Sequence, residues 1–386
     1  MLLGLRMDKL IDGFVDAYYG PSELKELVEN EKPVSPKQLL KSCKNLQKQL
    51  PGQNFIDERI RFLDKVLGAI ETSLDILSGK KMPFLEKVYK LYDIKPKMIH
   101  DSLFYKLAEK LDSLYEGSGT FIEHINEFNK NHEIPVEILE SILNHACKLV
   151  CEKTYKALPD LLPDNEEISF EFVKNKPWGA YNWYLGDFKS KIEINTSTPI
   201  DCLTVLKLVT HEAYPGHHTE HAVKEKQLFI EQQRFEHSIL LIPTPESVIS
   251  EGIGNIALDI LFTDQEKGQF ILDELCHNPS NMDLNVLFAY MQALHKRSLL
   301  YNNLAILAHE DGWSDDKLMK YSMNFGFIPE KFIKQILKFI RHPIWSTYVF
   351  NYSFGENLIK EKFGKYPSPK DFKMLLTHPI LPSDLK

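Results

Sequence analysis

The chain has 386 residues, of which 43% are apolar and 26% are charged, a composition typical of a globular protein and too apolar for a disordered one. Its formal net charge is −8, which argues against a nucleic-acid-binding protein because such proteins carry a basic surface. No run approaches the roughly 18–20 consecutive apolar residues of a membrane helix, and the apolar start over residues 1–5 is shorter than the core of a signal peptide. We therefore expect a cytoplasmic protein that binds neither nucleic acid nor a membrane.

The first 160 residues have the pattern of helices. Ser35 followed by Pro36 is typical of a helix start, and residues 60–77 carry apolar side chains three and four apart. Residues 135–158 predict a further long helix on the same grounds. We therefore predict an N-terminal helical lobe over residues 1–160.

A different pattern begins near residue 165. Residues 168–172 and 191–195 alternate apolar and polar side chains, which is the period of a strand, and the aromatic-rich residues 178–185 lie between them. These three segments predict one small antiparallel β-sheet.

Helices dominate the remainder of the chain. Thr198 and Pro199 have the pattern of a helix cap and its first turn, and a long helix is predicted over residues 283–310. Residues 161–386 are therefore expected to form a second lobe, which packs with the first as one compact unit. The predicted fold is mainly α, with the small sheet placed just before the helix that leads into His211.

That helix runs into residues 211–221, which hold four of the fourteen histidines. The opening His211-Glu212 resembles the His-Glu-x-x-His zinc motif, in which two histidines on one helix face bind zinc and the glutamate activates water. Here Pro215 stands where the motif has its second histidine. Proline cannot donate to the carbonyl of His211 and its ring crowds that turn, so we expect the helix to break or kink, with Gly216 allowing an unusual turn.

Two histidines beyond the break are candidates for the second ligand. On an undistorted helix His218 would share the face of His211, whereas His217 would not. The break removes that premise, so ideal helix geometry does not choose between them. The alternative interpretation is that a histidine-rich helix end is a surface feature favoured by the helix dipole.

A third ligand is offered by Glu251, which begins an otherwise apolar stretch and is followed by Gly252 and Gly254. A carboxylate commonly joins two histidines at a catalytic zinc site. The two glycines would let another helix approach closely. The alternative is an acidic residue that merely stabilises the first turn of a helix.

His-Glu-x-x-Pro-Gly-His-His followed by Glu-Gly resembles the prokaryotic domain-of-unknown-function family eight-eight-five. Residues 13–21, 178–186 and 352–355 are similar to it as well, so the resemblance covers nearly the whole chain. The family looks like a distant relative of helical zinc peptidases of the thimet oligopeptidase and carboxypeptidase Taq kind, which implies a zincin-like helical architecture. Carried over by position, the resemblance implies His211, His217 and Glu251 as metal ligands and Glu212 as the catalytic glutamate, with His218 as an additional candidate.

The C-terminal region offers hydrogen-bond donors for the reaction. Hydrolysis places negative charge on the former carbonyl oxygen, and a donor aimed at that oxygen contributes about 3 kcal/mol or more. Tyr352 is the preferred catalytic candidate because it lies in the family-like Tyr-Ser-Phe-Gly, and Tyr348 and Arg341 are further candidates. The alternative is that these tyrosines only pack between helices.

Together these patterns predict a zinc-dependent hydrolase, specifically a metallopeptidase of short peptides with one Zn²⁺ per chain. Glu212 is expected to take a proton from the attacking water and to pass it to the leaving amine. The strand ending at Asn195 is expected to offer its edge to an extended peptide. The alternatives are a zinc hydrolase of another amide or ester, a metal-binding protein without catalysis, and an interaction protein whose histidine motif is a relic.

Overall fold

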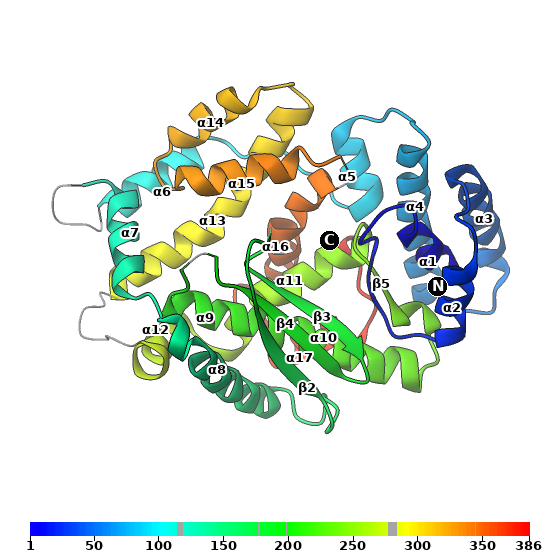
Figure 1. Ribbon diagram of the computed structural model, residues 1–386, viewed down its shortest axis with the longest axis horizontal. Coiled ribbons are helices and arrows are strands. Elements are labelled where there is room, and N and C mark those ends of the chain that lie inside the picture. Colours follow the sequence, from blue (N-terminus) through cyan, green and yellow to red (C-terminus); the bar gives the residue numbers. More distant parts are fainter. Residues whose placement is uncertain (114–118, 177, 198, 277–283, 344) are drawn as a thin grey trace.

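The computed structural model describes residues 1–113, 119–176, 178–197, 199–276, 284–343 and 345–386. It is mainly helical and contains two small sheets (Figure 1). None of the described helices is both long and apolar enough to cross a membrane.

The first part of the chain is helical, as predicted. Ser35 caps its helix by accepting from the backbone N–H of Gln38, and Pro36 opens the first turn. The helices predicted over residues 60–77 and 135–158 are present as α4 and α8. The helices of this part are α1 (Leu2–Asp8), α2 (Ser22–Asn30), α3 (Pro36–Gln49), α4 (Asp57–Leu77), α5 (Phe84–Tyr92), α6 (Ser102–Asp112), α7 (Phe121–Asn131) and α8 (Val136–Ala157).

The three predicted strands are present as β2 (Glu167–Val173), β3 (Ala180–Gly186) and β4 (Lys189–Asn195), but their sheet is mixed. β3 and β4 form an antiparallel hairpin whose two turn residues, Asp187 and Phe188, have the positive φ angles that such a turn needs. β2 pairs in parallel with the other side of β4, so the prediction of an antiparallel sheet is wrong for this pair.

The strand order β2-β4-β3 has a functional consequence, because it places β4 in the centre of the sheet. The strand that ends at Asn195 has partners on both sides and cannot offer its edge to a peptide, which corrects the sequence-based expectation. The edge strands of this sheet are β2 and β3.

A second sheet was not predicted. β1 (Val15–Tyr18) pairs antiparallel with β5 (Ile239–Leu241), more than 200 residues later in the chain. Strands of four and three residues are too short to show a clear period in the sequence. This pairing ties the start of the chain to the segment that leads into α11.

The helix after the mixed sheet begins later than predicted. Asp201 is its N-cap and accepts from the backbone N–H of Thr204 at 2.7 Å. Pro199 therefore precedes the helix, and the predicted cap Thr198 lies outside the described residues. The later helices are α9 (Cys202–Leu208), α10 (His217–Lys224), α11 (Pro245–Leu261), α12 (Asp264–Phe270), α13 (Leu284–His309), α14 (Asp315–Met323), α15 (Glu330–Ile340), α16 (Asn351–Phe363) and α17 (Pro369–Thr377).

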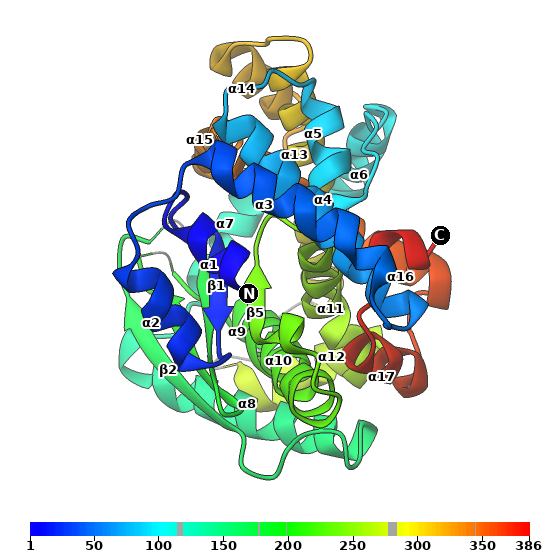
Figure 2. The ribbon, with the colours of Figure 1, turned by 90° about the vertical axis from the view of Figure 1, so that its right-hand side faces the viewer.

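The buried apolar clusters draw on both parts of the sequence. One cluster contains Tyr92 of α5 together with Ile253 of α11 and Phe350, which directly precedes α16. Another joins Leu143 of α8 to Ile192 of β4 and to α9. Figures 1 and 2 accordingly show α11 surrounded by elements from the beginning and the end of the chain.

α11 and α16 touch through their backbones. A Cβ atom added to Gly355 of α16 would lie 1.9 Å from the carbonyl oxygen of Val248, and one added to Gly252 would lie 2.6 Å from the carbonyl carbon of Gly355. The two glycines therefore set the distance between the helices. Glu251, the residue before Gly252, is held at this crossing.

We expect Gly355→Ala to lower the free energy of unfolding by about 3 kcal/mol or more, because the added methyl group can fit only if the two helices separate. Gly68→Ala in α4 is the matched control, since a Cβ there meets nothing within 4 Å. Denaturant unfolding followed by circular dichroism measures both variants. Equal stability of Gly355→Ala and the wild type would show that the crossing is looser than described.

Candidate metal centre

Between α9 and α10 the chain makes the π-helical turn Val209–Ala213 and then leaves the helix. Tyr214 is extended, the peptide bond before Pro215 is cis, and α10 starts again at His217. The predicted break at Pro215 is therefore confirmed. Gly216 is required here, because a Cβ on it would lie 1.9 Å from the carbonyl oxygen of His211.

This reversal brings two histidines together. The ring centroids of His211 and His217 lie 4.7 Å apart, with the rings nearly perpendicular. Glu251 of α11 faces them, and its Oε2 is 3.6 Å from Nε2 of His211. One nitrogen or oxygen of each of the three residues lies within 4.8 Å of those of the other two. The structure thus brings together the three side chains that the family resemblance implies as ligands.

The contacts of Glu251 fit a metal ligand. Its Oε1 accepts from the hydroxyl of Tyr348 at 2.7 Å, whereas its Oε2 is buried without a hydrogen-bond partner among the described residues. A buried oxygen left unpaired is costly, and a cation between Oε2 and the imidazoles would satisfy it. Two imidazoles and one carboxylate form a donor set that catalytic zinc sites use. The residues present therefore suit Zn²⁺.

The second glycine of the Glu251 segment supports the other ligand. A Cβ on Gly254 would lie 2.7 Å from Cε1 of His211, so only glycine leaves room for this ring. The sequence predicted that Gly252 and Gly254 would both admit another helix. Gly252 does so, whereas Gly254 admits the imidazole.

His218 lies apart from this group. Its side chain is fully buried, and its ring nitrogens lie 2.8 Å from Oγ of Ser190 and 2.9 Å from Oε2 of Glu166. Both nitrogens are thus engaged by residues on or beside the mixed sheet. His218 fastens α10 to that sheet, and it is His217 that lies next to His211.

Behind His217 lies a charged contact that the sequence analysis missed. Oε2 of Glu220 is 3.6 Å from Nδ1 of His217 and accepts from the hydroxyl of Ser250 at 2.7 Å. Its Oε1 accepts from the ammonium of Lys224 at 2.7 Å. His217, Glu220 and His221 also form a compact donor group, but Lys224 already neutralises Glu220. Glu220 therefore orients His217, as carboxylates do for metal-binding histidines. Its spacing of three residues from His217 on a helix was the available signal.

Glu212 lies beside the three candidate ligands. Its backbone carbonyl accepts from Nδ2 of Asn182 on β3 at 2.6 Å, which ties the π-helical turn to the sheet. Burial raises the pKa of its carboxyl group to about 7; the positive charge of His217 opposes this shift, and the negative charges of Glu251 and Asp16 add to it.

The two histidines differ in their protonation. Burial lowers the pKa of His211 well below its ordinary value. Burial would also lower the pKa of His217, but the carboxylates of Glu220, Glu212 and Glu251 raise it to about 9. The carboxylates of the cluster thus favour a positive charge at His217.

Asp16 of β1 is a further residue that the sequence analysis missed. Its carboxylate accepts from the hydroxyl of Tyr181 on β3, and its charge acts on both His217 and Glu212. The β1–β5 pairing carries it there. The only signal was its position within residues 13–21, one of the family-like stretches.

The three C-terminal candidates have different surroundings. Tyr348 donates to Glu251, and Tyr352 packs edge-on against Tyr348 with ring centroids 5.7 Å apart while remaining 40% exposed. Arg341 is not brought to the cluster. Its guanidinium pairs with Asp315 and donates to the carbonyl oxygens of Ala308 and Trp313, so it holds the end of α13.

No family model and no curated protein matches the chain. One similar solved structure is a protein of Colwellia psychrerythraea described as a "putative lipoprotein". It is 15% identical with a TM-score of 0.54, and the match covers 91% of this chain and 68% of that one. Another, a Shewanella oneidensis protein described in the same words and as of unknown function, is 12% identical with a TM-score of 0.45 and coverage of 88% and 72%. The first likeness concerns the fold alone.

We expect His211→Ala, His217→Ala and Glu251→Ala each to lose the bound metal, because each removes one of three ligands. His218→Ala is the matched control and should retain the metal, since its ring contacts Ser190 and Glu166 instead. Elemental analysis after incubation with Zn²⁺ and dialysis measures the content, which should be about one ion per wild-type chain. Full metal content in His217→Ala together with loss in His218→Ala would reverse the assignment.

Proposed function

We propose that this protein is a zinc-dependent metallopeptidase that hydrolyses short peptides. The observation that carries the proposal is the unpaired, buried Oε2 of Glu251, which faces His211 and His217 with Glu212 alongside. The resemblance to family eight-eight-five and to helical zinc peptidases agrees with it. A zincin-like arrangement, with His211 and Glu212 on one helical segment and Glu251 on a later helix, is part of the proposal.

Zn²⁺ bound by these residues would polarise the substrate carbonyl and lower the pKa of a water molecule towards neutrality. Glu212 then acts as the general base. A carboxyl group whose pKa lies near 7 is suited to accept a proton from water and to return it to the leaving amine. Its position next to His211 directs it beside the ligands instead of among them.

The two tyrosines have separate roles in this proposal. Tyr348 donates to Oε1 of Glu251 and so holds that carboxylate with its other oxygen towards the histidines. Tyr352 makes no such contact through its hydroxyl among the described residues and is partly exposed, so it can turn its O–H towards the substrate oxygen. Tyr352 is therefore the catalytic donor and Tyr348 a positioning residue.

The sheet next to the cluster offers a place for an extended peptide. β3 is an edge strand, and its Asn182 and Tyr181 contact Glu212 and Asp16. A peptide that added itself to β3 would run past the proposed metal with its backbone fixed by strand pairing. This role of β3 replaces the one that the sequence assigned to β4.

Glu212→Gln keeps the shape of the side chain and removes the base. We expect unchanged metal content and thermal stability, and a fall of roughly 10²–10⁴-fold in hydrolysis of the best substrate from a panel of short peptides, other amides and esters. Glu29→Gln, an exposed change on α2, is the control. Wild-type turnover by a zinc-loaded Glu212→Gln enzyme would exclude the mechanism, and a panel cleaved only at esters would replace the peptidase with another hydrolase.

Tyr352→Phe and Tyr348→Phe separate the two tyrosine roles. We expect Tyr352→Phe to lower kcat by roughly 10²-fold without changing Zn²⁺ affinity, because it removes only a donor to the transition state. Tyr348→Phe should weaken Zn²⁺ binding by roughly 10–100-fold, because it frees Glu251. Metal competition with a chelator and steady-state kinetics measure both. Identical effects of the two changes would contradict the assignment.

A further inference from the structure

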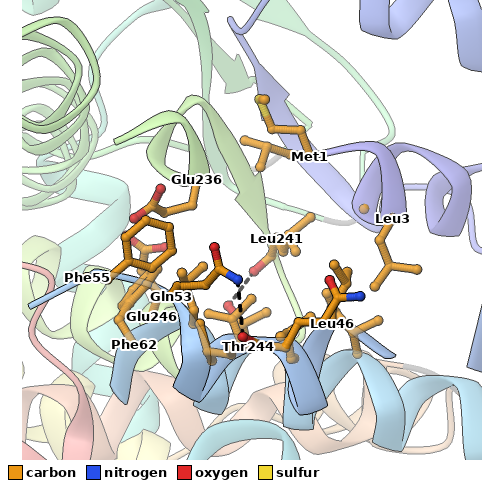
Figure 3. Close-up of a pocket in the computed structure, with 18 residues that line it drawn as sticks. Met1, Leu3, Leu46, Gln53, Phe55, Phe62, Glu236, Leu241, Thr244 and Glu246 are labelled. Atoms are coloured by element: carbon orange, nitrogen blue, oxygen red, sulfur yellow. Dashed lines mark hydrogen bonds between the residues drawn. The ribbon is translucent and has the colours of Figure 1, made fainter. Parts of the chain in front are cut away.

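A pocket of about 330 Å³ lies between α3, α4 and β5 (Figure 3). Its lining is mostly apolar and includes Leu46, Leu50, Phe62 and Leu241, while none of the proposed metal ligands lines it. Leu46 is 44% exposed, so the pocket opens to solvent at α3. A cavity of this size and lining is typical of a small-molecule site.

The polar end of the pocket carries two carboxylates, Glu236 and Glu246, which Figure 3 shows beside Phe55 and Phe62. Glu236 is satisfied, because Nε and Nη2 of Arg59 donate to its two oxygens at 2.7 Å each. Glu246 differs. Its Oε1 accepts from Lys224 at 3.0 Å, whereas Oε2 makes no hydrogen bond to any described residue.

The positive charge next to Glu246 is divided. Lys224 also donates to Oε1 of Glu220 at 2.7 Å, so one buried ammonium serves two carboxylates. Nδ1 of His237 lies 3.9 Å from Oε1 of Glu246, and its ring packs against Phe62. Burial lowers the pKa of His237 to about 4, so this ring is neutral at physiological pH. Glu246 therefore keeps acceptor capacity at Oε2, on the wall of an apolar pocket, and shares its ammonium partner with Glu220.

We propose that this pocket binds a small primary amine with an apolar body, whose ammonium group donates to Oε2 of Glu246. A cavity of about 150 Å³ holds one benzene molecule, so this pocket has room for about a dozen non-hydrogen atoms. The apolar body would lie against Leu46, Leu50 and Phe62. A carboxylate of the same size would be repelled by Glu246, and an alcohol would form the hydrogen bond without the charge.

The test compares 4-phenylbutylamine, 4-phenylbutanol and 4-phenylbutyrate by isothermal titration calorimetry on the full chain. EDTA is present, so that an amine cannot bind through a metal and the result does not depend on the proposed function. We expect one amine per chain, bound about tenfold more tightly than the alcohol because the hydrogen bond is to a charged group, and no measurable binding of the carboxylate. An amine that binds no better than the alcohol, or none of the three binding, would overturn the proposal.

Two variants locate the site. Glu246→Gln should reduce the affinity for the amine to that for the alcohol and leave the alcohol unaffected. Leu46→Trp should block the mouth of the pocket and abolish binding of both, while Leu27→Trp, at a leucine that is 48% exposed on α2 and does not line the pocket, should change nothing. If Glu246→Gln does not fold, Leu46→Trp decides, since normal amine binding by that variant would place the ligand elsewhere.

Discussion

The candidate centre depends on three places where backbone must come closer than any side chain allows. Gly216 lets the start of α10 contact the carbonyl of His211, Gly254 leaves room for the ring of His211, and Gly252 lets α11 meet Gly355 of α16. At Gly216 and Gly252 an added Cβ would lie 1.9 Å and 2.6 Å from backbone atoms, and at Gly254 it would lie 2.7 Å from the ring of His211. These contacts set the positions of the segments that carry the two histidines and Glu251. The geometry of the cluster therefore depends on these glycines as well as on the ligands themselves.

Around the cluster the fold concentrates negative charge that it does not fully neutralise. Glu212, Glu251 and Asp16 come from three different elements and act on one another through a poorly hydrated region. Carboxylates in such a place either take up protons or share a cation. Burial raises the pKa of all three carboxyl groups, and the carboxylates around His217 raise the pKa of its imidazole. A divalent cation shared by these carboxylates would instead keep them ionised. The electrostatics and the ligand geometry therefore both agree with the proposed metal site.

The sequence predicted local features well and distant pairings poorly. The break at Pro215 followed from the chemistry of proline, and the small residues around Glu251 indicated a close approach. The choice between His217 and His218 did not follow, because it depends on a turn whose direction is set by Gly216 and on Glu166 and Ser190, which hold His218. The parallel pairing of β2 with β4 and the β1–β5 pair were missed for the same reason: each depends on a partner that no local period reveals. Asp16 and Glu220 carry no motif, and only the folded chain shows what they face.

Lys224 donates to both Glu220 and Glu246, and so connects the candidate metal centre to the apolar pocket. Glu220 contacts His217, while Glu246 lines the pocket beneath α3 and α4. Charge added beside Glu246 would act on the same ammonium group that pairs with Glu220, the carboxylate that lies 3.6 Å from Nδ1 of His217. By linkage, any such effect would be reciprocal. If an amine bound in the pocket changed the affinity of His217 for a cation by some factor, the cation would change the affinity of the pocket for the amine by the same factor.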